Sequence, residues 1–183
     1  MWKIVSFLFI TMILIYISRA SLRAPRSHGF HRFFAWECIL GLFLLNVDFW
    51  FYRPFAWYQL IAWTLLFASL IPLTLGVSAL KSRGKPTANR ESDLSLLAFE
   101  KTTQLVTSGV YKYIRHPLYS SLFLLTWGIF FKNPSAVGIV LAVTATVFLV
   151  FTAKADESEC IQFFGSDYSE YMKKSKMFIP YLF

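Results

Sequence analysis

The residues best suited to chemistry in this sequence are Arg115, His116 and Pro117, which stand where a polar loop meets a strongly apolar segment. Proline suits the first turn of a helix and disfavours a helical conformation at the residue before it, so we expect a helix to begin at Pro117 with His116 as its cap. A guanidinium, an imidazole and the free N–H groups of a helix start would then lie together. This arrangement favours a negatively charged ligand group, although the same residues could simply anchor a helix end at a membrane surface.

A second polar group, Asp156 and Glu157 with Glu159 close behind, follows Arg115 and His116 after two apolar segments joined by a short turn. If these segments form a helical hairpin, the two polar groups differ in depth by only about 9 Å at ~1.5 Å per residue. The carboxylates would then return to the level of the basic pair. Such a site offers partners to a ligand that carries both a carboxylate and an ammonium group, and interfacial salt bridges without a ligand are the alternative.

The composition places these residues in a membrane protein. The chain has 183 residues, is 56% hydrophobic and contains 20 phenylalanines, which is more apolar surface than one soluble domain could bury. The net charge of +8 would suggest nucleic acid in a soluble chain, but here the basic residues fall between apolar spans. Because these basic residues are explained by membrane topology, we expect no nucleic-acid partner. Cys38 and Cys160 are far apart and no CxxC or HExxH motif occurs, so we expect no metal site.

The apolar segments predict an all-α, multi-pass membrane helical bundle with about five transmembrane helices. A signal peptide is disfavoured at the N-terminus because the arginines follow the first apolar segment rather than precede it. The expected spans are Ile4–Ile17, Phe33–Phe51, Trp57–Leu80, Leu118–Phe131 and Ala136–Ala153.

The basic residues predict the orientation of the bundle. With the N-terminus outside, all of the 18 lysines and arginines except Lys3, Arg53 and Lys132 fall on one side, as the positive-inside rule requires of the cytoplasmic side. The site and the C-terminal tail would therefore face the cytoplasm. Two acids in the second span, Glu37 and Asp48, are expected within about a turn of its ends, where they can reach the interface.

We expect one domain over residues 1–183: N-terminal spans in 1–80, a cytosolic loop in 81–108, and a catalytic, cofactor-binding hairpin and tail in 109–183. Within the loop, Leu94–Phe99 could form a short interfacial helix or a lid. In the tail, an apolar stripe indicates a packing face of a cytosolic amphipathic helix; it consists of Ile161, Phe164, Tyr168 and Tyr171. Gly165 should break this helix, and Asp167 with Glu170 should cap the next one.

The run Gly109-x-Tyr111-x-x-x-Arg115-His116-Pro117-x-Tyr119 resembles the signature of the isoprenylcysteine carboxyl methyltransferase family. So does Asp156-Glu157, followed by Phe164-Gly165-x-x-Tyr168-x-x-Tyr171. The two parts have the family's order and separation, and they cover residues 106–180. Members of this family are integral membrane enzymes that use S-adenosyl-L-methionine, and phospholipid methyltransferases are their relatives.

The resemblance implies a set of residues around S-adenosyl-L-methionine. The expected cofactor-binding residues are Tyr111, Arg115, His116, Pro117, Tyr119, Asp156 and Glu157, and the expected catalytic residues are Arg115, His116 and Glu157. Two positions depart from the family pattern, which usually has glutamate at Asp156 and often has glycine at Ser121. These changes shorten one carboxylate and alter the cofactor pocket.

The resemblance also implies a lipophilic or prenylated acceptor that enters from the bilayer, most simply an isoprenylcysteine-type carboxylate. Such a carboxylate is ionised at neutral pH and needs no general base. The alternatives are N-methylation of a phospholipid amine or S-methylation of a small thiol, for which His116 or Glu157 could accept the proton. A different class of protein, a non-catalytic membrane bundle or accessory protein, also remains open.

Overall fold

The computed structural model describes residues 1–85 and 100–180, and the predicted element at Leu94–Phe99 lies outside them. The described part is helical. Its α-helices are α1 (Trp2–Leu22), α2 (His28–Asn46), α3 (Trp57–Arg83), α4 (Pro117–Phe130), α5 (Ala136–Phe164) and α6 (Ser166–Lys174), with 3₁₀ turns η1 (Val47–Phe49) and η2 (Gly109–Lys112).

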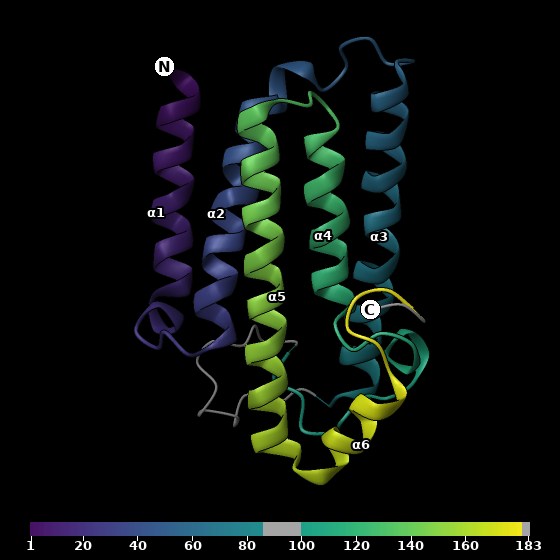
Figure 1. The fold of residues 1–183 in the computed structure, drawn as a ribbon. Coiled ribbons are helices and arrows are strands. Elements are labelled where there is room, and N and C mark those ends of the chain that lie inside the picture. Colours follow the sequence, from purple (N-terminus) through teal and green to yellow (C-terminus); the bar gives the residue numbers. More distant parts are fainter. Residues whose placement is uncertain (86–99, 181–183) are drawn as a thin grey trace.

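Helices α1 to α5 run side by side, and the lower part of α5 extends past its neighbours before α6 turns back (Figure 1). Helix α3 packs mainly on α4 and helix α2 on α5, while α1 lies at the edge against α2. Within residues 1–85 and 100–180, four helices are long and apolar enough to cross a membrane, namely α1, α2 with η1, α3 and α5. The fifth, α4, is apolar but has only 14 residues. The predicted all-α membrane bundle is confirmed.

Helix α2 begins at His28, more than one helical turn before Phe33, where the second span was expected to start. It begins at His28 because Ser27 is extended and its hydroxyl accepts the N–H of Phe30, at 3.2 Å, as an N-cap. The connection between α1 and α2 is therefore shorter than the gap between the two expected spans, residues 18–32. His28 and Arg32, four residues apart, lie on one face of the first turn of this helix rather than in a loop.

Helix α5 also continues beyond its expected end at Ala153, so that its last three turns carry the acidic residues out of the apolar part. It ends at Phe164 because Gly165 adopts a positive φ of 61°, which confirms the predicted break. The predicted capping pair of α6 is wrong. No side chain caps this helix, and Glu170 instead pairs with Lys173 at 2.5 Å.

The expectation that Glu37 lies near a helix end is wrong, because it sits in the middle of α2. Its carboxylate accepts a hydrogen bond of 2.7 Å from Thr11 of α1, which gives the peripheral helix a polar contact within the apolar zone. Asp48 does lie at the end of the span, where it forms an ion pair of 2.6 Å with Lys3.

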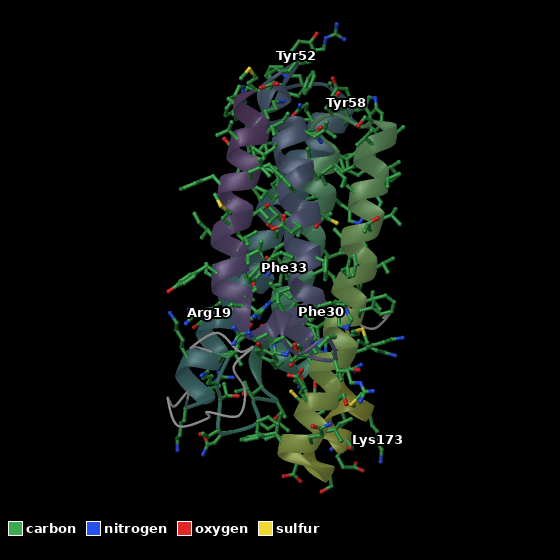
Figure 2. All side chains as sticks on the ribbon, turned by 90° about the vertical axis from the view of Figure 1, so that its left-hand side faces the viewer. Arg19, Phe30, Phe33, Tyr52, Tyr58 and Lys173 are labelled. Carbon is green, nitrogen blue, oxygen red and sulfur yellow. The ribbon has the colours of Figure 1, made fainter. Side chains whose placement is uncertain are left out.

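The end of the bundle away from α6 is closed by Lys132, in the turn between α4 and α5. Its ammonium donates to Gln59 Oε1 at 3.0 Å and lies 3.4 Å from the ring centre of Trp63. In return, Gln59 donates to the carbonyl of Lys132 at 3.0 Å. A buried cation is tolerated here because carbonyl, amide and aromatic groups surround it. Figure 2 shows the two ends, with Tyr52 and Tyr58 at one and Arg19 and Lys173 at the other.

Small residues allow α3 to approach α4 closely. A Cβ atom at Gly128 of α4 would lie 2.9 Å from Leu66 Cγ and 3.1 Å from the Leu66 backbone nitrogen of α3. A Cβ atom at Gly76 of α3 would lie 3.1 Å from Pro117, the first residue of α4. Close approach at both ends fixes where α4 begins relative to α3, and so fixes the site at that helix start.

We expect Gly128→Ala to destabilise the protein by about 1–3 kcal/mol, because the added methyl group forces α3 and α4 apart. Gly41→Ala in α2 is the matched control, since a Cβ atom there meets nothing closer than 3.8 Å. The measurement is the thermal unfolding midpoint in detergent. Equal midpoints for the two variants would contradict the close α3–α4 contact.

Candidate functional site

The site lies where the start of α4 meets the end of α5. The C-terminal segment runs beside the residues that precede α4 and pairs with them like a short strand. Arg115 N–H donates to the carbonyl of Lys176 at 2.7 Å, and Lys176 N–H donates to the carbonyl of Tyr113 at 3.0 Å. Helix α4 begins at Pro117 with His116 as the N-cap residue, as predicted, although the His116 side chain makes no capping bond.

The imidazole of His116 lies between two carboxylates of α5. Its Nδ1 is 3.3 Å from Asp156 Oδ2, and its Nε2 is 3.3 Å from Glu157 Oε1. One face of the ring stacks on Tyr119, with ring centres 5.4 Å apart. Burial alone would lower the pKa of His116, but the hydrogen bonds and charges of Asp156 and Glu157 outweigh burial and raise it. The protonated ring therefore has an acceptor for each N–H.

Arg115 holds the end of the chain in place. Its Nε donates to Glu157 Oε1 at 2.7 Å, and its Nη1 donates to the carbonyls of Met172 and Ser175 at the end of α6. A single guanidinium thus joins the start of α4 to α5 and to α6. Glu157 joins the same junction, since its one oxygen receives both Arg115 and His116.

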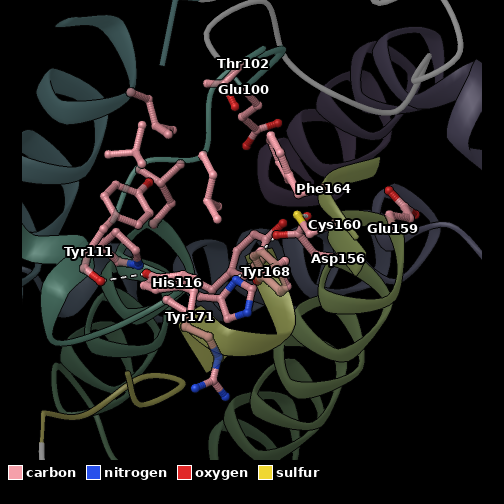
Figure 3. A pocket seen from close by; sticks show the side chains of 17 residues that line it. Glu100, Thr102, Tyr111, His116, Asp156, Glu159, Cys160, Phe164, Tyr168 and Tyr171 are labelled. Carbon is pink, nitrogen blue, oxygen red and sulfur yellow. Dashed lines mark hydrogen bonds and ion pairs between the residues drawn. The ribbon is translucent and has the colours of Figure 1, made fainter. Parts of the chain in front are cut away.

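An open pocket of about 770 Å³, counting its mouth, lies beside this junction. Figure 3 shows His116 and Asp156 near its centre, with Glu100 and Glu159 toward one side and Tyr111 and Tyr171 toward the other.

Tyrosines also line the pocket. Tyr168 and Tyr171 of α6 lie edge to face, with ring centres 5.7 Å apart. The hydroxyl of Tyr171 donates to the carbonyl of Tyr111 at 2.6 Å, which ties α6 to η2. Burial raises the pKa of Tyr111, Tyr168 and Tyr171, so these hydroxyls stay neutral. These tyrosines offer ring faces, which can stack on a planar ligand or contact a cation.

Two further acids of the pocket are paired by basic residues of α2. Glu100 accepts from Arg32 Nη1 at 3.0 Å, and Glu159 lies 2.6 Å from His28 Nδ1. Each carboxylate at the site therefore has a basic partner on another segment of the chain. These pairs hold the carboxylates in place while leaving Glu100, Asp156 and Glu159 on the pocket wall.

The structure brings the predicted site residues together. Those on the pocket wall are Tyr111, Arg115, His116, Pro117, Tyr119 and Asp156, whereas Glu157 lies behind the wall. The sequence pattern predicts only a packing role for Tyr168 and Tyr171, and it does not indicate that Glu100, Cys160, His28 or Arg32 belong to the site. The Ser27 cap signal could have placed His28 and Arg32 on a helix, but nothing in the sequence places Glu100 beside α5.

The polar groups and rings of the pocket suit a ligand that carries a carboxylate, an ammonium group and a planar ring. The first N–H groups of α4 have no acceptor within the helix and suit a carboxylate, while Asp156 suits an ammonium group. A metal ion could be held by His28, Asp156 and Glu159, whose ligand atoms lie within 4.8 Å of one another. Because His28 already bonds Glu159 and His116 bonds Asp156, these carboxylates are balanced by the chain's own side chains.

Comparison with known proteins finds that this region is similar to methyltransferases. Residues 90–166 match the model of the phospholipid methyltransferase family. The protein-S-isoprenylcysteine O-methyltransferase of Mus musculus is 36% identical over 83 residues, which cover 44% of this chain and 29% of that protein. The methanethiol S-methyltransferase of Pseudomonas deceptionensis is 30% identical over 77 residues, which cover 42% of this chain and 28% of that protein.

A longer match reaches into the N-terminal spans. The probable protein-S-isoprenylcysteine O-methyltransferase of Oryza sativa subsp. indica is 26% identical over 125 residues, or 66% of this chain and 63% of that protein. None of the solved structures matches the chain. The chain thus spans under a third of the length of the Mus musculus relative. These matches confirm the resemblance to the isoprenylcysteine carboxyl methyltransferase family.

His116 makes stability depend on pH. Because its pKa is higher in the folded protein than in the unfolded chain, its contribution is complete below the ordinary value of about 6.5 and is lost as the pH rises through the raised value. We expect the unfolding midpoint to fall, as the pH rises above about 6.5, more steeply in the wild type than in His116→Gln. Equal slopes for the two proteins would contradict the assignment.

Proposed function

We propose that this chain is an integral membrane methyltransferase that takes the methyl group of S-adenosyl-L-methionine and transfers it to a lipophilic acceptor. The observation that supports this most is the pocket beside Asp156 and His116. It combines a helix start, a carboxylate wall and tyrosine rings at the residues that carry the family resemblance. When bound, the donor supplies an electrophilic methyl group on a sulfonium.

In this proposal the residues of the chain bind the methyl donor and orient it toward the acceptor. The first amides of α4, at Leu118 and Tyr119, would hold the donor carboxylate, and Asp156 would hold the neighbouring ammonium group. The rings of Tyr111, Tyr168 and Phe164 would enclose the planar base and exclude water. Orientation of the two reactants can supply much of the rate enhancement, because a sulfonium needs little activation.

The structure suggests supporting roles for Arg115 and Glu157. Both were expected to contact the donor, but the guanidinium is already committed to Glu157 and to the carbonyls of α6. We therefore propose that this pair holds His116 and the C-terminal segment in position. His116 lies nearer the pocket than Glu157, and the hydrogen bonds to Asp156 and Glu157 raise its pKa, which favours the protonated ring over the neutral ring that could accept a proton.

The acceptor proposed first is an isoprenylcysteine-type carboxylate, as the names of the mouse and rice relatives suggest. One observation favours the second candidate, an amine or a thiol. The arginines at the pocket, Arg32 and Arg115, both form ion pairs with glutamates, and the wall carries three carboxylates. Because both guanidinium groups are already paired, a neutral acceptor would disturb fewer contacts at the pocket than a second anion would.

The proposed acceptor would enter from the bilayer, with its apolar tail between helices and its reactive group at the pocket. We also propose that the pocket faces the cytoplasm, because the positive-inside rule favours that side for the basic residues near it. The direct test is a screen of candidate acceptors with methyl-labelled donor and purified protein. Labelled product from any acceptor supports an enzyme, and donor binding without transfer to any of them would favour an accessory protein.

We expect Asp156→Asn to weaken S-adenosyl-L-methionine binding by about 1.5 kcal/mol or more, roughly tenfold, because a charged hydrogen bond to the ammonium group is lost. Asp48→Asn is the control, since Asp48 pairs with Lys3 at the other end of the bundle. Calorimetry in detergent gives both affinities. Unchanged binding in Asp156→Asn would remove this residue from the proposed donor site.

A further inference from the structure

His28, in the first turn of α2, contacts both carboxylate oxygens of Glu159 on the pocket wall. The backbone N–H of His28 donates to Glu159 Oε1 at 2.8 Å, and His28 Nδ1 lies 2.6 Å from Glu159 Oε2. His28 is fully buried, and it stands well before residues 90–166, which carry the family match. A residue outside the matched region therefore fixes a wall of the site.

The N-terminus of α2 is an electrostatically favourable place for the Glu159 carboxylate. His28 is the first residue of α2, so its N–H is one of the amides that have no acceptor within the helix, and the helix dipole favours negative charge there. Glu159 is also the outer partner of the pair, with 26% of its side chain exposed against none for His28. The histidine thus holds the carboxylate from behind while the carboxylate lines the pocket.

The position of Glu159 relative to Asp156 suggests what it contacts. The two residues are three apart on α5, so they lie on one face about 4.5 Å apart along the axis. In S-adenosyl-L-methionine, two methylene groups separate the carbon that bears the ammonium group from the sulfur, which is a similar span. With the ammonium group at Asp156, the sulfonium comes within reach of Glu159.

We infer that His28 is a positioning residue, which holds the Glu159 carboxylate beside the sulfonium of the bound methyl donor. This inference rests on the proposed function. A carboxylate oxygen fixed at this place contacts the charged sulfonium of the donor, whereas the sulfur of S-adenosyl-L-homocysteine, the product, is neutral and gains less from this contact. The first turn of α2 thereby helps the pocket to bind the donor and to release the product.

The experiment measures the affinities of the full-length protein for S-adenosyl-L-methionine and S-adenosyl-L-homocysteine by calorimetry. We expect His28→Ala to weaken donor binding about tenfold and product binding less than about threefold, as loss of one charged contact to the sulfonium requires. His28→Asn should restore donor binding, because its side-chain amide can donate from nearly the position of Nδ1. His31→Ala is the matched control, since His31 contacts Phe30 and Phe151 rather than the pocket.

A double variant separates positioning from a general structural role. If His28 acts through Glu159, then His28→Ala combined with Glu159→Gln should weaken donor binding no more than Glu159→Gln alone. Additive losses, equal losses for donor and product, or unchanged donor binding in His28→Ala would each overturn the inference. If His28→Ala does not fold, Glu159→Gln and His28→Asn still test it, because the first must lose donor selectivity and the second must keep it.

The two proposals fail in different ways. A wild-type protein that binds neither ligand would overturn the proposed function and this inference together. A wild-type protein that binds the donor, with a His28→Ala variant that binds it equally well, would overturn only the role of His28.

Discussion

The structure depends on the junction in which Arg115 and His116 meet Asp156 and Glu157. Two charges of each sign come together at the edge of an apolar bundle, where an unpaired charge would be costly. Glu157 is shared by both basic residues, so the start of α4 cannot move without breaking contacts to α5. The same arginine binds carbonyls at the end of α6, and the C-terminal segment is thereby held beside the pocket.

The fold and the centre of the site could be predicted because they follow from local rules. Long apolar segments predict spans, Pro117 predicts a helix start, and Gly165 predicts a helix end. The meeting of Arg115 with Glu157 follows from counting residues along two helices of a hairpin. Helical rise is nearly constant, so the depth of a residue in such a hairpin can be calculated from the sequence alone.

The outer part of the site could not be predicted in the same way. Glu100 and Arg32 come together because a loop residue packs on a helix that is distant in the sequence. Counting residues along the chain does not predict such a contact. His28 lies before the expected start of the second span at Phe33, because the apolar segment begins there, whereas the helix already begins at the Ser27 cap. Glu37 was expected near the interface, but it lies in the middle of α2, where Thr11 donates a hydrogen bond to one of its carboxylate oxygens.

The central claim is that the pocket beside the junction binds S-adenosyl-L-methionine, and Cys160 on its wall gives the most direct test. In a Cys38→Ser variant, Cys160 is the only cysteine, so its alkylation rate reports on the pocket alone. The account predicts that saturating S-adenosyl-L-methionine slows this alkylation several-fold, and that it leaves the alkylation of Cys38 unchanged in a Cys160→Ser variant. An alkylation rate of Cys160 that is the same with and without the donor would contradict the account.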